Sequence, residues 1–179
     1  PLGKLILVLR NPYAQFLSRL KYWDKAGWQL RNIVAQISNL QGLDFFYRCV
    51  SSQSYRENVL VVKYEDLVTK PREVMKTTAQ FLGVSFSEEM LKPSVFGRGV
   101  VVSTSTRDTD KIFTESLEKW KTDLSSLQKH LVTLFAQSAQ IHGYELDYQL
   151  PRFLRSLLSS DLLQALAGFY LRCHLRVNR

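Results

Sequence analysis

The pattern of apolar positions predicts two strands, each followed by a helix. Residues 5–9 are a continuous apolar run with β-branched members, as expected for a strand buried on both faces of a parallel sheet. The Asn11-Pro12 pair that follows suits the N-cap and the first position of a helix. Residues 58–64 form the second apolar run, and Pro71 then opens another helix. The pattern therefore predicts an α/β fold, a parallel sheet flanked by helices in three layers.

Further amphipathic stretches predict a helix-rich C-terminal half. One helix is expected over residues 28–40 with Gly42 as its stop, and residues 44–54 are also expected to be helical. Helices are predicted again over residues 115–121 and 124–142. Glycine is also the predicted helix stop at Gly83 and Gly143. The inward-facing side chains of the last helix are expected to be Leu127, Leu131, Leu134, Phe135 and Ile141.

The chain has two further regions: residues 93–110 and the C-terminal stretch. Residues 93–110 contain two glycines and a run of serine and threonine, which predicts a long functional or mobile loop with a short strand at 100–102. The C-terminal stretch, residues 151–176, has the pattern of one or two amphipathic helices. We therefore expect a partial domain over residues 1–147 and an amphipathic helical extension over residues 148–179. Because the chain opens at Pro1 directly before a strand, we also expect it to be N-terminally truncated.

The net charge favours anionic binding partners but does not distinguish among them. With 24 basic and 16 acidic side chains in 179 residues, the net charge is +8, which favours a nucleotide, a sulfated or phosphorylated substrate, nucleic acid or a lipid surface. The two cysteines and three histidines show no metal-ligand spacing, so no metal site is expected. No apolar run is long enough to span a membrane. Membrane association through a missing N-terminus or the basic tail stays open, and so do cytoplasmic and Golgi-type locations.

Arg10 is the first candidate binding residue, because it stands at the carboxyl end of a predicted strand and before a helix. In open parallel sheets, ligands bind beyond the carboxyl ends of the strands, and a helix start attracts anions. The arginine fork can hold a phosphate through two hydrogen bonds. Ser18, two helical turns later, can donate to the same phosphate. The alternative is that Arg10 pairs with a carboxylate and Ser18 has no such role.

A second polar group follows the second strand, on the same edge of the sheet. Tyr64 can stack on a purine through its ring. Glu65 and Asp66 are adjacent on an extended chain and point apart, so a structural role is expected for them rather than acid–base chemistry.

Three blocks of sequence, in order and at matching spacing, resemble the sulfotransferase superfamily, whose members use 3′-phosphoadenosine-5′-phosphosulfate. The resemblance covers residues 4–146. Its blocks are Lys4 to Pro12 with Ser18; residues 58–67 with Pro71 and residues 81–83; and Trp120 with Gly143-Tyr144.

The resemblance implies a sulfuryl transfer to a hydroxyl or amine acceptor, with no metal. It implies that Arg10 and Ser18 hold the 3′-phosphate of the donor and that Tyr64 lies against the adenine. Arg98, in a loop where many members close over the nucleotide, is a further candidate for a phosphate contact, although a solvated loop cation fits it equally well.

The chain also departs from the family's pattern. The Pro-x-Ser-Gly-Thr-Thr loop that cradles the 5′-phosphosulfate and its lysine are not found in the 179 residues. Because the family's catalytic base usually lies between that loop and the Arg-Asn-Pro segment, we expect it to be missing as well. We therefore expect this chain to be inactive alone, and its catalytic residues are unknown. Two other functions remain open: a P-loop kinase-like nucleotide enzyme, and a non-catalytic basic binding module. No nucleic-acid motif supports the latter.

Overall fold

The structure is a computed structural model, and it describes residues 3–25, 33–51, 58–92, 94–95, 98–99, 102–103, 108–109, 114, 116–146 and 148. These residues belong to two compact units. The first comprises residues 1–11 and 52–119, and the second residues 12–51 and 120–179, each where described. The predicted tail helices of residues 151–176 lie outside the described residues, and the boundary proposed at residue 147 stays a prediction.

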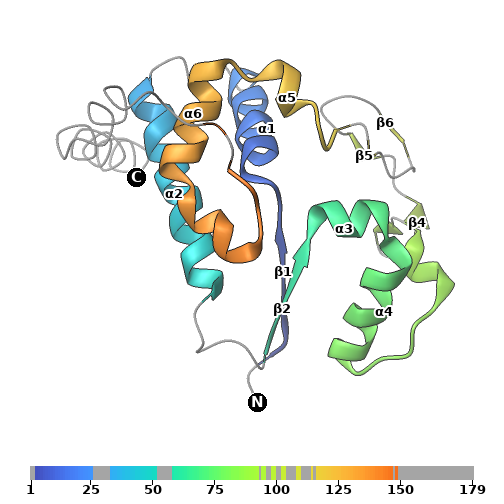
Figure 1. The fold of residues 1–179 in the computed structure, drawn as a ribbon. Helices are drawn as coiled ribbons and strands as arrows, with labels where there is room; N and C mark the ends of the chain where they lie inside the picture. The colour runs from blue at the N-terminus through green and yellow to red at the C-terminus, as the bar shows by residue number, and fades with distance from the viewer. Residues whose placement is uncertain are drawn as a thin grey trace, which may run out of the picture. The chain divides into compact units, whose positions relative to one another are not determined.

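The first unit contains a parallel pair of strands, β1 (Leu5–Leu9) and β2 (Val59–Lys63) (Figure 1). Both predicted strands, and their parallel pairing, are confirmed. The expected burial on both faces is wrong, because Leu5 and Val8 are 49% and 48% exposed. Among the described strands, β1 and β2 pair only with each other.

Two helices follow β2. They are α3 (Tyr64–Thr69) and α4 (Pro71–Leu82), and Pro71 and Gly83 start and close α4 as predicted. Gly83 has a left-handed φ of 78°, and its N–H donates to the carbonyl of Gln80, which satisfies the end of the helix. The fold of this unit is therefore α/β.

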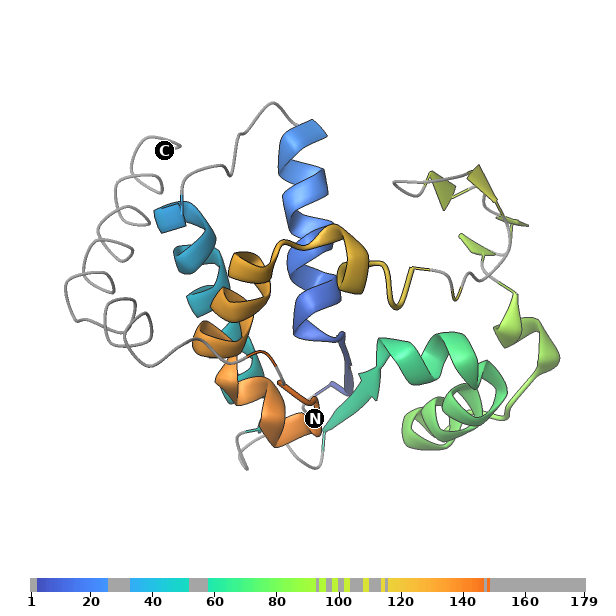
Figure 2. The ribbon, with the colours of Figure 1, turned by 45° about the horizontal axis from the view of Figure 1, so that its top comes forward.

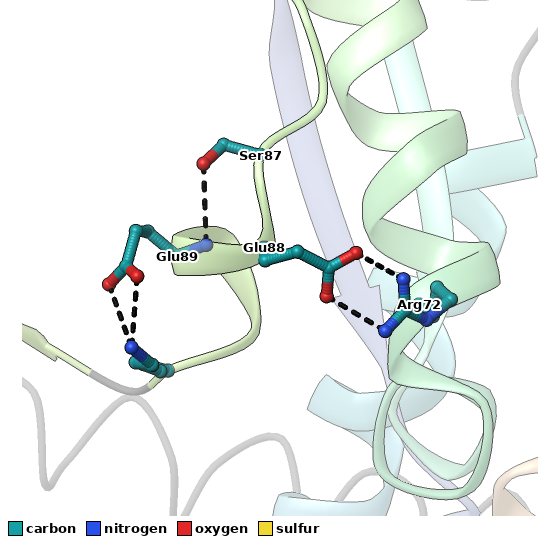
Figure 3. Close-up of polar contacts among 5 residues, drawn as sticks. Arg72, Ser87, Glu88 and Glu89 are labelled. Carbon is teal, nitrogen blue, oxygen red and sulfur yellow. Dashed lines mark hydrogen bonds and ion pairs between the residues drawn. The ribbon is translucent and has the colours of Figure 1, made fainter.

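A bidentate ion pair connects α4 with the short 3-10 helix η2 (Glu88–Leu91). The guanidinium of Arg72 donates to both carboxylate oxygens of Glu88 (Figure 3). Ser87 precedes η2, and its hydroxyl accepts a hydrogen bond from the backbone N–H of Glu89, as an N-cap residue does. Both side chains of the ion pair are more than half exposed, so the pair contributes little stability.

Short antiparallel strands occupy the described parts of the predicted loop. β3 (Ser94–Val95) pairs with β4 (Arg98–Gly99), and β5 (Val102–Ser103) pairs with β6 (Asp108–Thr109). Of the strand expected at 100–102, Val102 lies in β5, and residues 100 and 101 lie outside the described residues.

The second unit is helical. It contains α1 (Pro12–Lys25), α2 (Ile33–Ser51), α5 (Trp120–Asp123), α6 (Ser126–Phe135) and the 3-10 helix η3 (Gln137–His142). Helices α2 and α6 lie side by side (Figure 2). The buried side chains of the unit include Phe16, Ile37, Leu40, Leu43, Tyr47, Leu131 and Val132.

Three predictions of helix bounds are wrong. Gly42 does not stop a helix, because α2 continues through it to Ser51, and residues 44–51 belong to the same helix. The helix expected over 115–121 is limited to α5, preceded by turns and bends at residues 116–119. The helix expected over 124–142 breaks at Ala136 between α6 and η3.

A tertiary hydrogen bond accompanies the break at Ala136. The backbone N–H of Ser138 donates to Oδ1 of Asp44 on α2 at 2.7 Å. Leu131 and Phe135 are buried as predicted, whereas Leu127 and Ile141 are exposed, and the stop at Gly143 is confirmed by its φ of 72°. No described helix is long and apolar enough to cross a membrane.

Candidate functional site

The parallel register brings the ends of β1 and β2 to one edge of the first unit. Leu9 is the register partner of Lys63, so the next residues, Arg10 and Tyr64, leave the two strands beside each other. This is the edge beyond the carboxyl ends of the strands, where open parallel sheets bind ligands. The sequence-predicted proximity of Arg10 and Tyr64 is therefore present in the fold.

The side chains of these two residues are in contact. Cζ of Arg10 lies 4.7 Å from the centroid of the Tyr64 ring, within the range of a cation–π interaction. Arg10 is half-buried, and its Nε is fully buried. Stacking uses the face of the guanidinium plane, and a phosphate is bound by the N–H groups in that plane. Contact with an aromatic ring and binding of an oxyanion thus use different parts of an arginine side chain.

Glu65 is a site residue whose contact was not predicted. Its Oε1 accepts a hydrogen bond from the backbone N–H of Asn11 at 2.8 Å. A protein carboxylate thus already uses the N–H of the residue that precedes α1, which was expected to attract an external anion. The contact joins residues 54 positions apart in the chain, and no local sequence pattern indicates it.

Ser18 lies in the second unit, on α1, and its side chain is exposed. The next residue, Arg19, turns towards α2, where its Nη1 donates to Oδ1 of Asn39 at 2.8 Å. Burial lowers the pKa of Arg19 from its ordinary value. Because Arg10 belongs to the first unit, the joint binding of one phosphate by Arg10 and Ser18 stays a prediction.

Arg98 lies in β4, where it pairs with Val95 of β3. This pairing fixes the backbone position of Arg98. The phosphate contact of the Arg98 side chain stays a prediction.

A hollow of about 290 Å³ lies elsewhere in the first unit, against β2, α3 and α4. Its lining mixes apolar strand residues with two lysines and two carboxylates, and it does not include Arg10 or Tyr64. Its charged side chains are those of Lys63, Asp66, Lys70 and Glu73. Within the described part of the chain, no group of three or more His, Cys, Asp or Glu side chains is arranged to hold a metal ion.

A family model described as "Sulfotransferase domain" matches residues 2–96, which is more than half of the chain and includes Arg10, Ser18 and Tyr64. The block around Trp120 and Gly143-Tyr144 lies beyond the match. No curated protein and no solved structure matched the chain.

Proposed function

This chain belongs to the sulfotransferase domain family, and we propose that it binds 3′-phosphoadenosine-5′-phosphosulfate through the 3′-phosphate of that donor. Membership supports a sulfotransferase activity in general. The donor, the residues that hold it and the acceptor, a hydroxyl or an amine, are the parts that we propose.

The contact between Arg10 and Tyr64 is the observation that carries the proposal. It joins a phosphate-binding side chain to an aromatic ring at 4.7 Å, at the carboxyl edge of a parallel strand pair. A nucleotide with a phosphate on its ribose needs both features: a cation for the phosphate and an apolar surface for the purine. Ser18 is proposed to donate to the same phosphate.

The 3′-phosphate does not react in sulfuryl transfer, so its binding acts by orientation. Binding energy from a remote, unreactive group holds the reacting sulfur in line with the acceptor oxygen or nitrogen. A base then takes the proton of the acceptor, and the negative charge that grows on the leaving nucleotide is stabilised by fixed donors. In this scheme Arg10 binds and orients the donor and takes no part in the proton transfer.

Calorimetric titration with adenosine 3′,5′-bisphosphate tests the proposal, with ADP as the comparison ligand. We expect selective binding of the bisphosphate and a loss of about 10- to 100-fold in Arg10→Ala, the range for a hydrogen bond to a charged group. Arg72→Ala is the matched control, because it removes an arginine whose guanidinium is engaged by Glu88. Circular dichroism establishes that each variant is folded.

Other outcomes would replace the proposal. A preference for nucleoside triphosphates with Mg²⁺ would favour a P-loop kinase-like enzyme. Binding to anionic polymers that falls steeply with salt, without nucleotide selectivity, would favour a basic binding module. Equal losses in Arg10→Ala and Arg72→Ala would remove Arg10 from the site.

A further inference from the structure

The ring of Tyr64 is in contact with protein before any ligand binds. The guanidinium of Arg10 lies over it, with Cζ 4.7 Å from the ring centroid. A purine that stacks on Tyr64 must therefore use ring surface that Arg10 does not cover. Tyr64 can therefore have two separable roles: it can contact the adenine of the ligand, and it contacts the guanidinium of Arg10.

The backbone fixes both partners of this contact. Arg10 directly follows the five-residue parallel register of β1 with β2, and Tyr64 is the first residue of α3. Burial of Nε restricts the Arg10 side chain further. A long side chain normally loses rotamer freedom when it binds a ligand, and one that is already held loses less. The guanidinium is thus oriented in advance of the phosphate.

We propose that Tyr64 is a positioning residue for Arg10, and that it thereby sets the preference for a nucleotide that carries a 3′-phosphate. This inference rests on the proposed function, because it assumes that Arg10 binds that phosphate. It differs from an adenine contact in its ligand dependence. An adenine contact strengthens the binding of every adenine nucleotide equally, whereas a positioned Arg10 strengthens only those with a 3′-phosphate.

Two ligands separate the roles: adenosine 3′,5′-bisphosphate and adenosine 5′-phosphate, which lacks the 3′-phosphate. The quantity of interest is the ratio of their dissociation constants, measured by calorimetry on the full chain. We expect Tyr64→Leu to reduce the preference for the bisphosphate by about three- to tenfold, the strength of a cation–π contact. Tyr64→Phe keeps the ring and should leave the ratio unchanged.

The Arg10→Ala background supplies the internal control. There, Tyr64→Leu should weaken the binding of both ligands by the same factor, since no guanidinium remains to be positioned. A ratio that Tyr64→Leu leaves unchanged in the wild-type background would overturn the inference and leave the proposed function standing. Failure of the wild-type chain to bind the bisphosphate would instead overturn the proposed function, and the inference with it.

If Tyr64→Leu does not fold, fluorinated phenylalanines at position 64 test whether the ring positions Arg10. They keep the shape of the ring and progressively weaken the negative potential of its face, on which a cation–π contact depends. We expect the preference for the bisphosphate to fall stepwise with the number of fluorine atoms. A constant preference across the series would overturn the inference.

Discussion

The backbone N–H of Asn11 donates a hydrogen bond to Oε1 of Glu65 at 2.8 Å. Asn11 is the second residue after the end of β1, and Glu65 is the second residue after the end of β2. The contact therefore ties together the two chain segments that carry Arg10 and Tyr64. It stands beside the contact between Arg10 and Tyr64 as a second connection across the carboxyl edge.

Loss of this acceptor should destabilise the fold. Glu65→Ala leaves the N–H of Asn11 without its partner, so we expect the free energy of unfolding to fall by about 1–3 kcal/mol. Glu65→Gln keeps an oxygen acceptor and should cost less. Urea denaturation followed by circular dichroism measures both.

Asp66→Ala is the matched control for Glu65, because it removes the neighbouring carboxylate in the same helical turn. The carboxylate of Asp66 lines the hollow, and the N–H of Asn11 donates to Glu65, so removal of Asp66 should change stability by less than about 1 kcal/mol. Equal costs for the two variants would show that the contact of Glu65 contributes nothing specific.

Ser18→Ala should separate binding from stability. Its hydroxyl is exposed on α1, and alanine has the higher helix propensity, so the variant should be as stable as the wild type or more stable by up to about 0.5 kcal/mol. If Ser18 donates to the 3′-phosphate, the affinity for adenosine 3′,5′-bisphosphate should nevertheless fall about tenfold.

Ser126→Ala serves as the control for Ser18, since Ser126 is also exposed in a helix, the first residue of α6. Calorimetry should give wild-type affinity for this variant. Unchanged affinity in Ser18→Ala as well would remove Ser18 from the binding site.

The second unit should depend on an aromatic stack. The rings of Tyr13 and Trp120 are stacked with centroids 4.5 Å apart, and the hydroxyl of Tyr13 is hydrogen-bonded to Oγ1 of Thr133 at 2.6 Å. We expect Trp120→Ala to cost about 3 kcal/mol, the low end for a large aromatic, because Trp120 is half-buried. Tyr13→Phe should cost about 1 kcal/mol, the usual contribution of one hydrogen bond.

Tyr22→Ala is the comparison for these aromatic variants. Tyr22 lies on the same helix as Tyr13 and is 70% exposed, so its removal should change the unfolding free energy by less than about 0.5 kcal/mol. A cost for Trp120→Ala no larger than this would mean that the stack does not stabilise the unit.

The sequence predicted correctly those elements that are determined by residues close together in the chain. The apolar runs of β1 and β2 predicted both strands, and the rule that such strands run parallel placed Arg10 and Tyr64 at one edge. Pro71 and Gly83 marked the ends of α4 for reasons that lie in their own backbones. The family match over residues 2–96 includes both of these strands and α4.

Contacts between distant residues were beyond such reasoning. The hydrogen bond from Asn11 to Glu65 and the one from Ser138 to Asp44 span 54 and 94 positions, and the second accompanies the break that the periodicity of residues 124–142 did not show. The exposure of Val8 was missed for a related reason. An apolar run predicts a strand, but the elements that cover it are set by the rest of the fold.

Two glycines with opposite roles provide the last prediction. Gly42 lies inside α2, and a Cβ added there would meet nothing within 4 Å, so Gly42→Ala should stabilise the chain by about 0.5–1 kcal/mol. Gly83 has a φ of 78°, which alanine adopts only with strain, so Gly83→Ala should destabilise it by about 1 kcal/mol. The added Cβ would lie 3.9 Å from Nζ of Lys4, an ordinary contact, so the cost is conformational and not steric. Urea midpoints that shift in the same direction for both variants would contradict the assignment of Gly42 to a helix interior and of Gly83 to a helix end.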